Sequence, residues 1–219
     1  LHNGEHVGNG DGPSCDVAVD PIDGTSLTAQ GMNGAISVIA LAPRGSMFDP
    51  KDSFYMNKIV TGPEAASVID ITASVSENIS KVAKAKSLNV SDITVVVLNR
   101  PRHKMLIEEI RNTGARIKII QDGDIAAAIE TARPDTGIDL LMGIGGTPEG
   151  VITAVAMICL GGAIQGQLYK DGITDPRVLT TSDLCNSDDV FLSATGITDG
   201  ELVQGIRYTR YGASSNSLV

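Results

Sequence analysis

Three short apolar segments in the second half of the chain, each followed by a helical pattern, constrain the fold most. The apolar segments lie at residues 92–98, 115–120 and 138–142. Continuous apolar runs of this length are typical of parallel strands that are buried on both faces. Helical patterns follow them at residues 102–112, 124–132 and 148–160. This order predicts a βαβαβα unit with a mostly parallel sheet covered by helices.

Capping residues support these boundaries. Ser76 is the expected N-cap of a further helix that precedes the first apolar segment, and Gly114 the expected C-cap of the helix at 102–112. Pro148 falls in a first helical turn, where its missing N–H donor costs nothing. A break near residue 76 therefore starts the helical half of the chain.

The first part of the chain has a different pattern. Residues 15–60 carry short β segments at 17–19, 35–41 and 54–60, separated by Gly, Pro and Asp. We accordingly divide the chain into a β-rich part, residues 1–75, and an α/β part, residues 76–219. The Ser-rich tail at residues 213–219 is expected to be loosely ordered.

Charge and cysteine content exclude several classes of protein. A net charge of −9 argues against nucleic acid and anionic membrane surfaces as partners. An anionic small molecule stays possible, because bound divalent cations would reverse the local sign of the charge. Cys15, Cys159 and Cys185 form no CxxC pair, and their odd number fits a reducing cytoplasm; Cys159 is expected in the core. With no signal peptide and no apolar run near ~20 residues, we expect a soluble cytoplasmic protein.

The richest chemical signal is the hexapeptide Asp-Pro-Ile-Asp-Gly-Thr at residues 20–25, directly after the apolar Val17–Val19. Pro21 ends the strand, and the following Asp-Gly favours a tight turn. Two carboxylates are thereby held on one rigid corner, as Mg²⁺ and similar hard cations require, with the Ile22 carbonyl as a possible third ligand. The alternative interpretation is an ordinary Asp-Gly turn.

The predicted order of strands and helices by itself predicts a ligand-binding site at the ends of the parallel strands. In open α/β sheets, ligands bind just beyond the carboxyl ends of the strands. The three strand ends here carry polar or glycine-rich sequences at residues 99–102, 121–124 and 143–147. These three segments are therefore expected to meet at one edge of the sheet.

The same segments carry a family resemblance. DPIDGT resembles the metal-binding signature of the lithium-sensitive, Mg²⁺-dependent phosphatases, and residues 8–40 look like the class II, bacterial-type fructose-1,6-bisphosphatases in particular. The likeness continues through NRPRH, QDGD, GIGGTPEG and SATGITDG. It implies a layered α-β-α-β-α sandwich of the sugar-phosphatase type. It also implies further acidic ligands upstream, so that the β-rich part is N-terminally incomplete, and a longer connector than the one at residues 168–178.

The resemblance implies that Asp20, Asp23 and Glu149 hold two or three Mg²⁺ or Mn²⁺ ions. For Glu149 the alternative is a favourable charge in a first helical turn. Asp23, Gly24 and Thr25 would contact the phosphate to be cleaved, and the Thr25 hydroxyl would hold the attacking water. A helix N-cap is the structural alternative for Thr25.

Substrate residues follow from the same resemblance. Arg100, Pro101 and Arg102 would hold the phosphate that is not cleaved, because forked guanidinium groups suit phosphate. A solvated basic turn is the interpretation we adopt for the adjacent His103 and Lys104.

The remaining substrate contacts have structural alternatives. Asp122, Gly123 and Asp124 would bind sugar hydroxyls, although Asp124 is also placed to cap a helix. Tyr55 would contact substrate or simply pack in its strand. Gly146, with Gly145, would allow the backbone to approach the substrate closely.

The predicted activity is metal-dependent hydrolysis of the 1-phosphate of fructose 1,6-bisphosphate, in gluconeogenesis or the Calvin cycle. Alternatives within the same chemistry are a sedoheptulose-1,7-bisphosphatase, alone or as a second activity, and an inositol monophosphatase. Dinucleotide binding at GIGGTPEG is disfavoured because Glu149 occupies the position of the last glycine in G-x-G-x-x-G. A non-catalytic sugar-phosphate sensor is the third class. The family resemblance also implies a homodimer or homotetramer.

Overall fold

The computed structural model describes residues 4–51 and 54–219, which form two packed sheets with helices between and above them. The larger sheet has the strand order β5-β4-β6-β3-β7-β8, with β9 paired to β7. Its strands are β3 (Tyr55–Thr61), β4 (Thr94–Leu98), β5 (Arg116–Ile120), β6 (Leu140–Gly146), β7 (Ala163–Lys170), β8 (Ile173–Thr174) and β9 (Leu179–Thr180).

The predicted parallel unit is present within this sheet. Strand β4 pairs in parallel with both β5 and β6, whereas β3 and β7–β9 extend the sheet through antiparallel pairs. The whole sheet is therefore mixed. The crossover and covering helices are α2 (Val75–Ala85), α3 (Lys104–Thr113), α4 (Asp124–Thr131) and α5 (Thr147–Leu160).

The smaller sheet has the order β1-β2-β10-β13. Its strands are β1 (Cys15–Asp23), β2 (Ile36–Pro43), β10 (Phe191–Gly196) and β13 (Ser217–Leu218), and α1 (Thr25–Gln30) follows β1. The short α6 (Thr181–Leu184) precedes β10, and β11 (Arg207–Thr209) pairs with β12 (Gly212–Ser214) as a separate hairpin. Since β3 lies in the larger sheet and β10 in the smaller one, the predicted division at residues 75 and 76 does not coincide with a boundary between the sheets.

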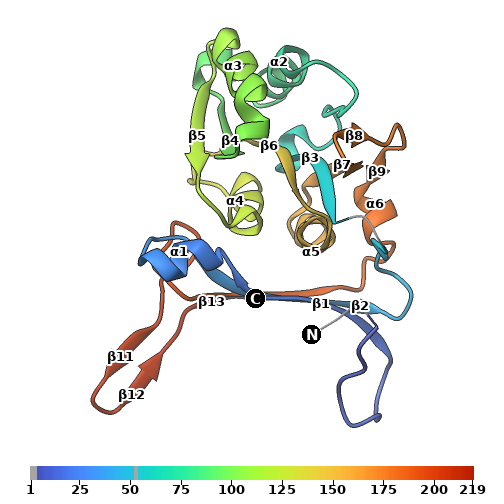
Figure 1. Ribbon diagram of the computed structural model, residues 1–219, viewed down its shortest axis with the longest axis vertical. Coiled ribbons are helices and arrows are strands. Elements are labelled where there is room, and N and C mark those ends of the chain that lie inside the picture. The colour runs from blue at the N-terminus through green and yellow to red at the C-terminus, as the bar shows by residue number, and fades with distance from the viewer. Residues whose placement is uncertain (1–3, 52–53) are drawn as a thin grey trace.

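The layers alternate in the order α-β-α-β (Figure 1). Helices α2 and α3 cover one face of the larger sheet, and α4 and α5 lie between the two sheets. Of the five layers in the predicted sandwich, the described residues form these four. Val17, Leu41 and Phe191 stand opposite one another across β1, β2 and β10, and Val17 and Phe191 are exposed.

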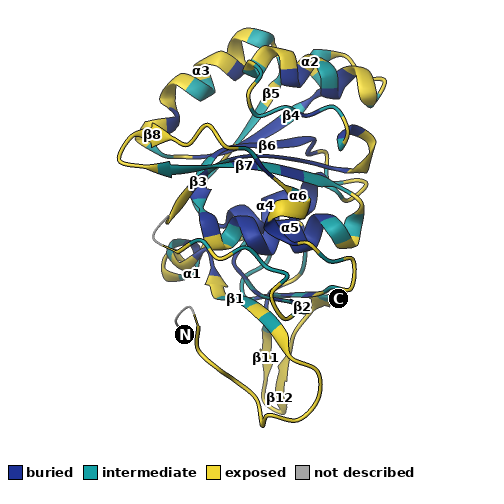
Figure 2. Ribbon diagram, turned by 90° about the vertical axis from the view of Figure 1, so that its right-hand side faces the viewer, coloured by how far each residue is buried: buried dark blue, intermediate teal, exposed yellow. Residues whose placement is uncertain are grey.

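Burial on both faces explains the continuous apolar strands. Along β4, Val95 and Val97 pack into the cluster under α2 and α3, whereas Val96 packs against the helices between the sheets. Helices α4 and α5 are buried nearly all round, as Figure 2 shows, because they have a sheet on each side. None of the helices in residues 4–51 and 54–219 combines the length and apolar character needed to cross a membrane.

Several local predictions are confirmed and others are wrong. Gly114 ends α3 with left-handed backbone, φ 84°, and Pro148 lies in the first turn of α5. The N-cap of α2 is Ser74 rather than Ser76, because the Ser74 side chain accepts the Glu77 N–H. Cys159 is exposed, since the end of α5 emerges from between the sheets.

The prediction of a loosely ordered tail is wrong. The tail expected to be loosely ordered supplies β12 and β13, and β13 pairs with β10 through Ala194–Leu218 and Thr195–Ser217. The connector at residues 168–178 is a tight hairpin from β7 to β8, with left-handed backbone at Asp171 and Gly172.

Candidate active site

The acidic corner at the end of β1 is a β-bulge. Asp20 pairs with Val38 of β2 and Asp23 pairs with Ile36, so two intervening residues of β1 oppose a single residue of β2. The Asp20 carboxylate also accepts the N–H of Ile22 at 3.0 Å, which fixes the bend. In a regular strand, residues three apart point to opposite faces, and the extra residue of a bulge removes that constraint.

Asp23 is buried at the N-terminus of α4. Its side chain is 5% exposed, and its Oδ2 accepts the N–H of Ile125 at 3.2 Å. Burial raises the pKa of Asp23 well above its usual value, and the charges of Asp124, Asp20 and Glu149 raise it further. These carboxylates therefore lie close enough to repel one another.

Gly24 and Thr25 start α1. Gly24 is the N-cap with φ 91°, and a Cβ there would lie 2.9 Å from Leu27 Cδ1, so glycine suits this position both by backbone and by space. Thr25 is the first helical residue and is exposed. The alternative that Thr25 itself caps the helix is therefore wrong.

Lys58 of β3 reaches the same region from the larger sheet. Its ammonium group donates to Asp124 Oδ2 at 2.6 Å and to the carbonyl of Gly146 at 3.2 Å, and the lysine is only 2% exposed. Asp124, the first residue of α4, is therefore one half of a buried ion pair. The sequence did not predict a role for Lys58; its weak signal is that it is the only charged residue of β3.

Glu149 lies in the first turn of α5. Burial raises its pKa; Lys58 opposes that shift, and Asp124 and Asp20 add to it. Its Oε2 is buried and has no hydrogen-bond partner among the described residues. An unpaired buried carboxylate oxygen is costly unless something else binds it.

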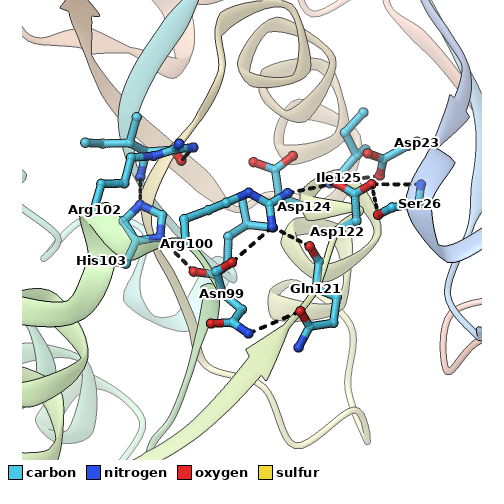
Figure 3. A network of polar contacts seen from close by, with 12 residues as sticks. Asp23, Ser26, Asn99, Arg100, Arg102, His103, Gln121, Asp122, Asp124 and Ile125 are labelled. Carbon is cyan, nitrogen blue, oxygen red and sulfur yellow. Dashed lines mark hydrogen bonds and ion pairs between the residues drawn. The ribbon is translucent and has the colours of Figure 1, made fainter. Parts of the chain in front are cut away.

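Arg100 and Asp122 form a polar network at the ends of β4 and β5 (Figure 3). Arg100 Nη1 donates to the carbonyls of Gln121 at 2.6 Å and Asn99 at 3.1 Å, and its Nη2 donates to Asp122 Oδ1 at 3.2 Å. Asp122 Oδ2 in turn accepts from the Ser26 hydroxyl at 2.6 Å. The guanidinium is thereby fixed in orientation at the ends of β4 and β5.

Arg102 is fixed by different contacts. Its Nη2 donates to the carbonyl of Ile144 at 2.8 Å, and its guanidinium lies 5.1 Å from the centre of the Tyr55 ring, which is a cation–π distance. Tyr55 is thus half-exposed at the cleft rather than packed in the strand. Pro101, between the two arginines, is exposed in a short 3₁₀ turn at Pro101–His103.

The prediction that His103 lies in a solvated basic turn is wrong. His103 is 2% exposed and spans the gap where β4 and β6 diverge. Its Nε2 accepts the N–H of Ile144 at 2.8 Å, so the proton is on Nδ1, which donates to the carbonyl of Leu98 at 2.7 Å. Burial lowers the pKa of His103. Lys104 is exposed, as expected.

Twelve of the described residues line a cleft of about 170 Å³. Of the residues predicted to form the site, the structure brings ten together there: Asp23, Tyr55, Arg100, Arg102, Asp122, Gly123, Asp124, Gly145, Gly146 and Glu149. Phe54 and Leu98 complete the lining and were not predicted. Asp20 and Thr25 lie on the bulge and helix beside the cleft, and Asp20 raises the pKa of both Asp23 and Glu149.

A larger hollow of about 670 Å³ lies elsewhere, between α6 and β7. Its lining has one charged side chain, Asp188, and otherwise hydroxyl, amide and apolar groups. The smaller cleft is lined by four carboxylates and two arginines. Charge therefore favours the smaller cleft as the site of chemistry on an anionic substrate.

Asp20, Asp23 and Glu149, which we call the acidic end of the cleft, could supply some but not all of the ligands of a metal ion. In residues 4–51 and 54–219, no three His, Cys, Asp or Glu side chains are gathered closely enough to hold a metal ion by themselves. The unpartnered Oε2 of Glu149 and the mutual repulsion of Asp20, Asp23 and Glu149 nevertheless fit a divalent cation whose other ligands are water or phosphate oxygens.

Comparison with known proteins agrees with this chemistry. Residues 1–219 match a protein-family model described as bacterial fructose-1,6-bisphosphatase, glpX-encoded. A D-fructose 1,6-bisphosphatase class 2/sedoheptulose 1,7-bisphosphatase from Crocosphaera subtropica is 43% identical over 93% of this chain and 66% of the relative. The protein of the same name from Microcystis aeruginosa gives the same values. That from Prochlorococcus marinus is 41% identical over 100% of this chain and 73% of the relative. The chain thus spans 66–73% of the length of these relatives.

Proposed function

This chain belongs to the bacterial fructose-1,6-bisphosphatase family, and we propose that it hydrolyses the 1-phosphate of fructose 1,6-bisphosphate to give fructose 6-phosphate and inorganic phosphate. The observation that carries this proposal is the polarity of the cleft. Its lining includes the carboxylates of Asp23 and Glu149, which would form the acidic end together with Asp20. It also includes the guanidinium groups of Arg100 and Arg102, which would form a basic end. A sugar with a phosphate at each end matches both.

The acidic end would receive the phosphate to be cleaved. Asp20, Asp23 and Glu149 would hold two or three Mg²⁺ or Mn²⁺ ions, which would neutralise the phosphate and acidify a bound water. A bound cation would favour the ionised form of these carboxylates, which burial and mutual repulsion otherwise disfavour. Lys58 keeps Asp124 in place beneath them.

The attacking group would be water. The cleft lining among the described residues contains no serine, cysteine or histidine that could act as a nucleophile. Thr25 lies exposed at the start of α1, and its hydroxyl would orient the water in line with the bond to be broken. The backbone N–H groups of Gly24 and Thr25 would contact the phosphate oxygens.

The basic end would bind the phosphate that remains. Arg100 and Arg102 are both oriented by backbone carbonyls, so their remaining N–H donors are fixed before the substrate arrives. Tyr55, stacked with Arg102, would lie along the sugar. Gly123 and Gly146 also line the cleft, where their backbone could approach the sugar closely.

The direct test is Asp20→Asn, assayed by phosphate release from fructose 1,6-bisphosphate with Mg²⁺ or Mn²⁺. We expect the activity to fall to background, because the substitution removes a charge from the cation site while preserving shape. Retained activity in this variant would refute the assignment of Asp20 as a ligand.

A second activity is favoured by the names of the relatives, which include sedoheptulose 1,7-bisphosphatase. The open arginine end of the cleft is compatible with a longer sugar bisphosphate. An inositol monophosphatase is disfavoured, because a monophosphate leaves Arg100 and Arg102 without a role. Arg100→Ala should raise the KM for the bisphosphate about tenfold or more, as expected for loss of a charged hydrogen bond, whereas a monophosphatase would be insensitive.

Assembly as a homodimer or homotetramer, location in the cytoplasm, and the absence of nucleic-acid and membrane partners stay predictions from the sequence. Sedimentation of the purified protein, with and without Mn²⁺, would measure the oligomeric state.

A further inference from the structure

Asp122 joins two parts of the site that lie 96 residues apart in the chain. Its Oδ2 accepts from the hydroxyl of Ser26 at 2.6 Å and from the Ser26 N–H at 3.2 Å. Its Oδ1 accepts from Arg100 Nη2 at 3.2 Å. Figure 3 shows the carboxylate between the two partners, with Ser26 on the side of α1 and Arg100 on the side of β4. Both carboxylate oxygens are therefore bound by the protein itself.

Arg100 is oriented by its contact with Asp122 and by two backbone carbonyls. Nη1 donates to the carbonyls of Asn99 and Gln121, and Nη2 donates to Asp122. The Nε–H has no acceptor among the described residues, so the guanidinium keeps donors for an external anion. A guanidinium held on one side by protein acceptors can present its remaining donors to a phosphate with little loss of entropy.

Ser26 belongs to the segment that carries the proposed reaction. It follows Thr25 directly, and it is half-buried in the first turn of α1. Because Ser26 is covalently continuous with the Asp20–Thr25 corner, a contact that holds Ser26 also holds this corner in place. Asp122 therefore connects that corner to Arg100. Two neutral donors of Ser26 bind the Asp122 carboxylate, and the contact between Asp122 and Arg100 is an ion pair.

We propose that Ser26 and Asp122 form a bridge that fixes the distance between the two phosphate subsites, and that Asp122 is a positioning residue that acts through Arg100 rather than by binding sugar hydroxyls. This inference rests on the proposed function, which assigns one phosphate to each end of the cleft. The bridge makes the site selective for bisphosphates of a given span, because a second phosphate gains the contact with Arg100 only at the fixed separation.

Substrate analogues without hydroxyl groups separate the two roles of Asp122. Hexyl phosphate and 1,6-hexanediol bisphosphate differ only in the second phosphate, so the ratio of their inhibition constants measures what that phosphate contributes. We expect 1,6-hexanediol bisphosphate to inhibit the wild-type protein more strongly than hexyl phosphate. In Ser26→Ala and Asp122→Ala this advantage should fall about tenfold, the effect of losing one charge-assisted hydrogen bond.

Two further variants sharpen the test. Ser26→Thr keeps the hydroxyl and should keep most of the advantage. The double variant Ser26→Ala/Asp122→Ala should lose no more than Asp122→Ala alone, because both act through one bridge. If Asp122→Ala does not fold, Ser26→Ala, at a half-buried helix position, carries the test.

The outcomes distinguish the bridge from the function on which it rests. An undiminished advantage in Ser26→Ala and Asp122→Ala, with a raised KM for fructose 1,6-bisphosphate in Asp122→Ala, would show that Asp122 binds sugar hydroxyls and would overturn the bridge. Equal inhibition of the wild-type protein by both compounds would instead overturn the assignment of a second phosphate to Arg100, and the bridge with it.

Discussion

The ammonium group of Lys58, in the middle of the larger sheet, lies 2.6 Å from the carboxylate of Asp124 at the N-terminus of α4, and both residues are less than 10% exposed. The pair links β3 to the helix layer between the two sheets. It also places one positive charge directly beneath a group of carboxylates. Lys58 therefore has two effects: it compensates the buried charge of Asp124 and it lowers the pKa of Glu149.

Replacing Lys58 by methionine should destabilise the protein strongly. The change leaves Asp124 buried without its partner, which costs about 3–5 kcal/mol of unfolding free energy for pairs of this kind. Denaturant unfolding at pH 7 measures the loss. Lys81→Met is the matched control, because Lys81 pairs with Glu77 on the exposed face of α2 and should change stability by about 0.5 kcal/mol or less.

The double variant Lys58→Met/Asp124→Leu tests whether the loss comes from the unpaired charge. Apolar replacement of both partners should return the free energy of unfolding to within about 1 kcal/mol of the wild-type value. If the double variant were as unstable as Lys58→Met, the lost packing of the lysine stem rather than the ion pair would be the cause.

Glu149→Gln should have opposite effects with and without divalent cations. In chelator at pH 8 the variant should be more stable than wild type, because burial and the nearby Asp20 and Asp124 charges disfavour an ionised Glu149. With Mn²⁺ at 100 times the wild-type dissociation constant, wild type should gain about 2.7 kcal/mol and the variant much less. Thermal unfolding in both conditions measures this.

The control for this experiment is Glu77→Gln, an exposed carboxylate on α2. Glu77→Gln should respond to Mn²⁺ as wild type does. An equal Mn²⁺ response in Glu149→Gln would remove Glu149 from the proposed ligands.

His103 predicts a specific pH dependence of stability. Burial lowers its pKa in the folded protein, so between the folded value and the unfolded value of about 6.5 the unfolded chain binds the extra proton. The contribution of the neutral His103 ring to the free energy of unfolding is therefore fully present above about pH 6.5. This contribution decreases as the pH falls from there toward the lower pKa of the folded protein. Protonation of Nε2 would also remove the acceptor for the Ile144 N–H.

The measurement compares wild type with His103→Asn at pH 7.5 and pH 5.5. The stability advantage of wild type should shrink at the lower pH. His6→Asn is the control, because it replaces an exposed histidine by the same residue without removing buried contacts. A constant difference between wild type and His103→Asn at the two pH values would contradict a neutral, buried ring.

The parallel core of the fold was predictable because its central strand is buried on both faces and because two of its helices are marked by glycine or proline: α3 ends at Gly114, and α5 has Pro148 in its first turn. Strand β4 shows why. The side chains of Val95 and Val97 enter one apolar cluster and that of Val96 enters the other, so the strand has no polar face and is a continuous apolar run in the sequence. The antiparallel additions were not predictable. Pairing of β3 with β6 and β7, or of β10 with β2, depends on contacts between distant segments that no local pattern records.

The location of the candidate site was predictable for a similar reason. Strand ends gather at one edge, which brings Arg100, Asp122 and Glu149 together from three segments. Local sequence gave the wrong environment for His103, because a histidine among Arg and Lys has the same neighbours in the chain whether or not it fills a gap between strands. Lys58 was missed because the carboxylate that compensates it lies 66 residues away.

Two adjacent glycines at the end of β6 should separate fold stability from cation binding. Neither has left-handed backbone, so alanine is tolerated by the main chain at both positions. A Cβ on Gly145 would collide with Asp124 Oδ2 and lie 2.8 Å from Lys58 Nζ, whereas a Cβ on Gly146 would collide with the carboxylate of Glu149. Gly145→Ala should therefore cost about 1–3 kcal/mol of unfolding free energy, typical of overpacking against a buried group.

Gly146→Ala should leave the free energy of unfolding within about 1 kcal/mol of wild type, because the Glu149 side chain can rotate away from the new methyl group. That same rotation moves the carboxylate from the acidic end of the cleft, so affinity for Mn²⁺ should fall about tenfold or more. Denaturant unfolding in chelator and Mn²⁺ titration calorimetry measure the two quantities independently. Unchanged Mn²⁺ affinity in Gly146→Ala would show that the position of the Glu149 carboxylate does not determine cation binding.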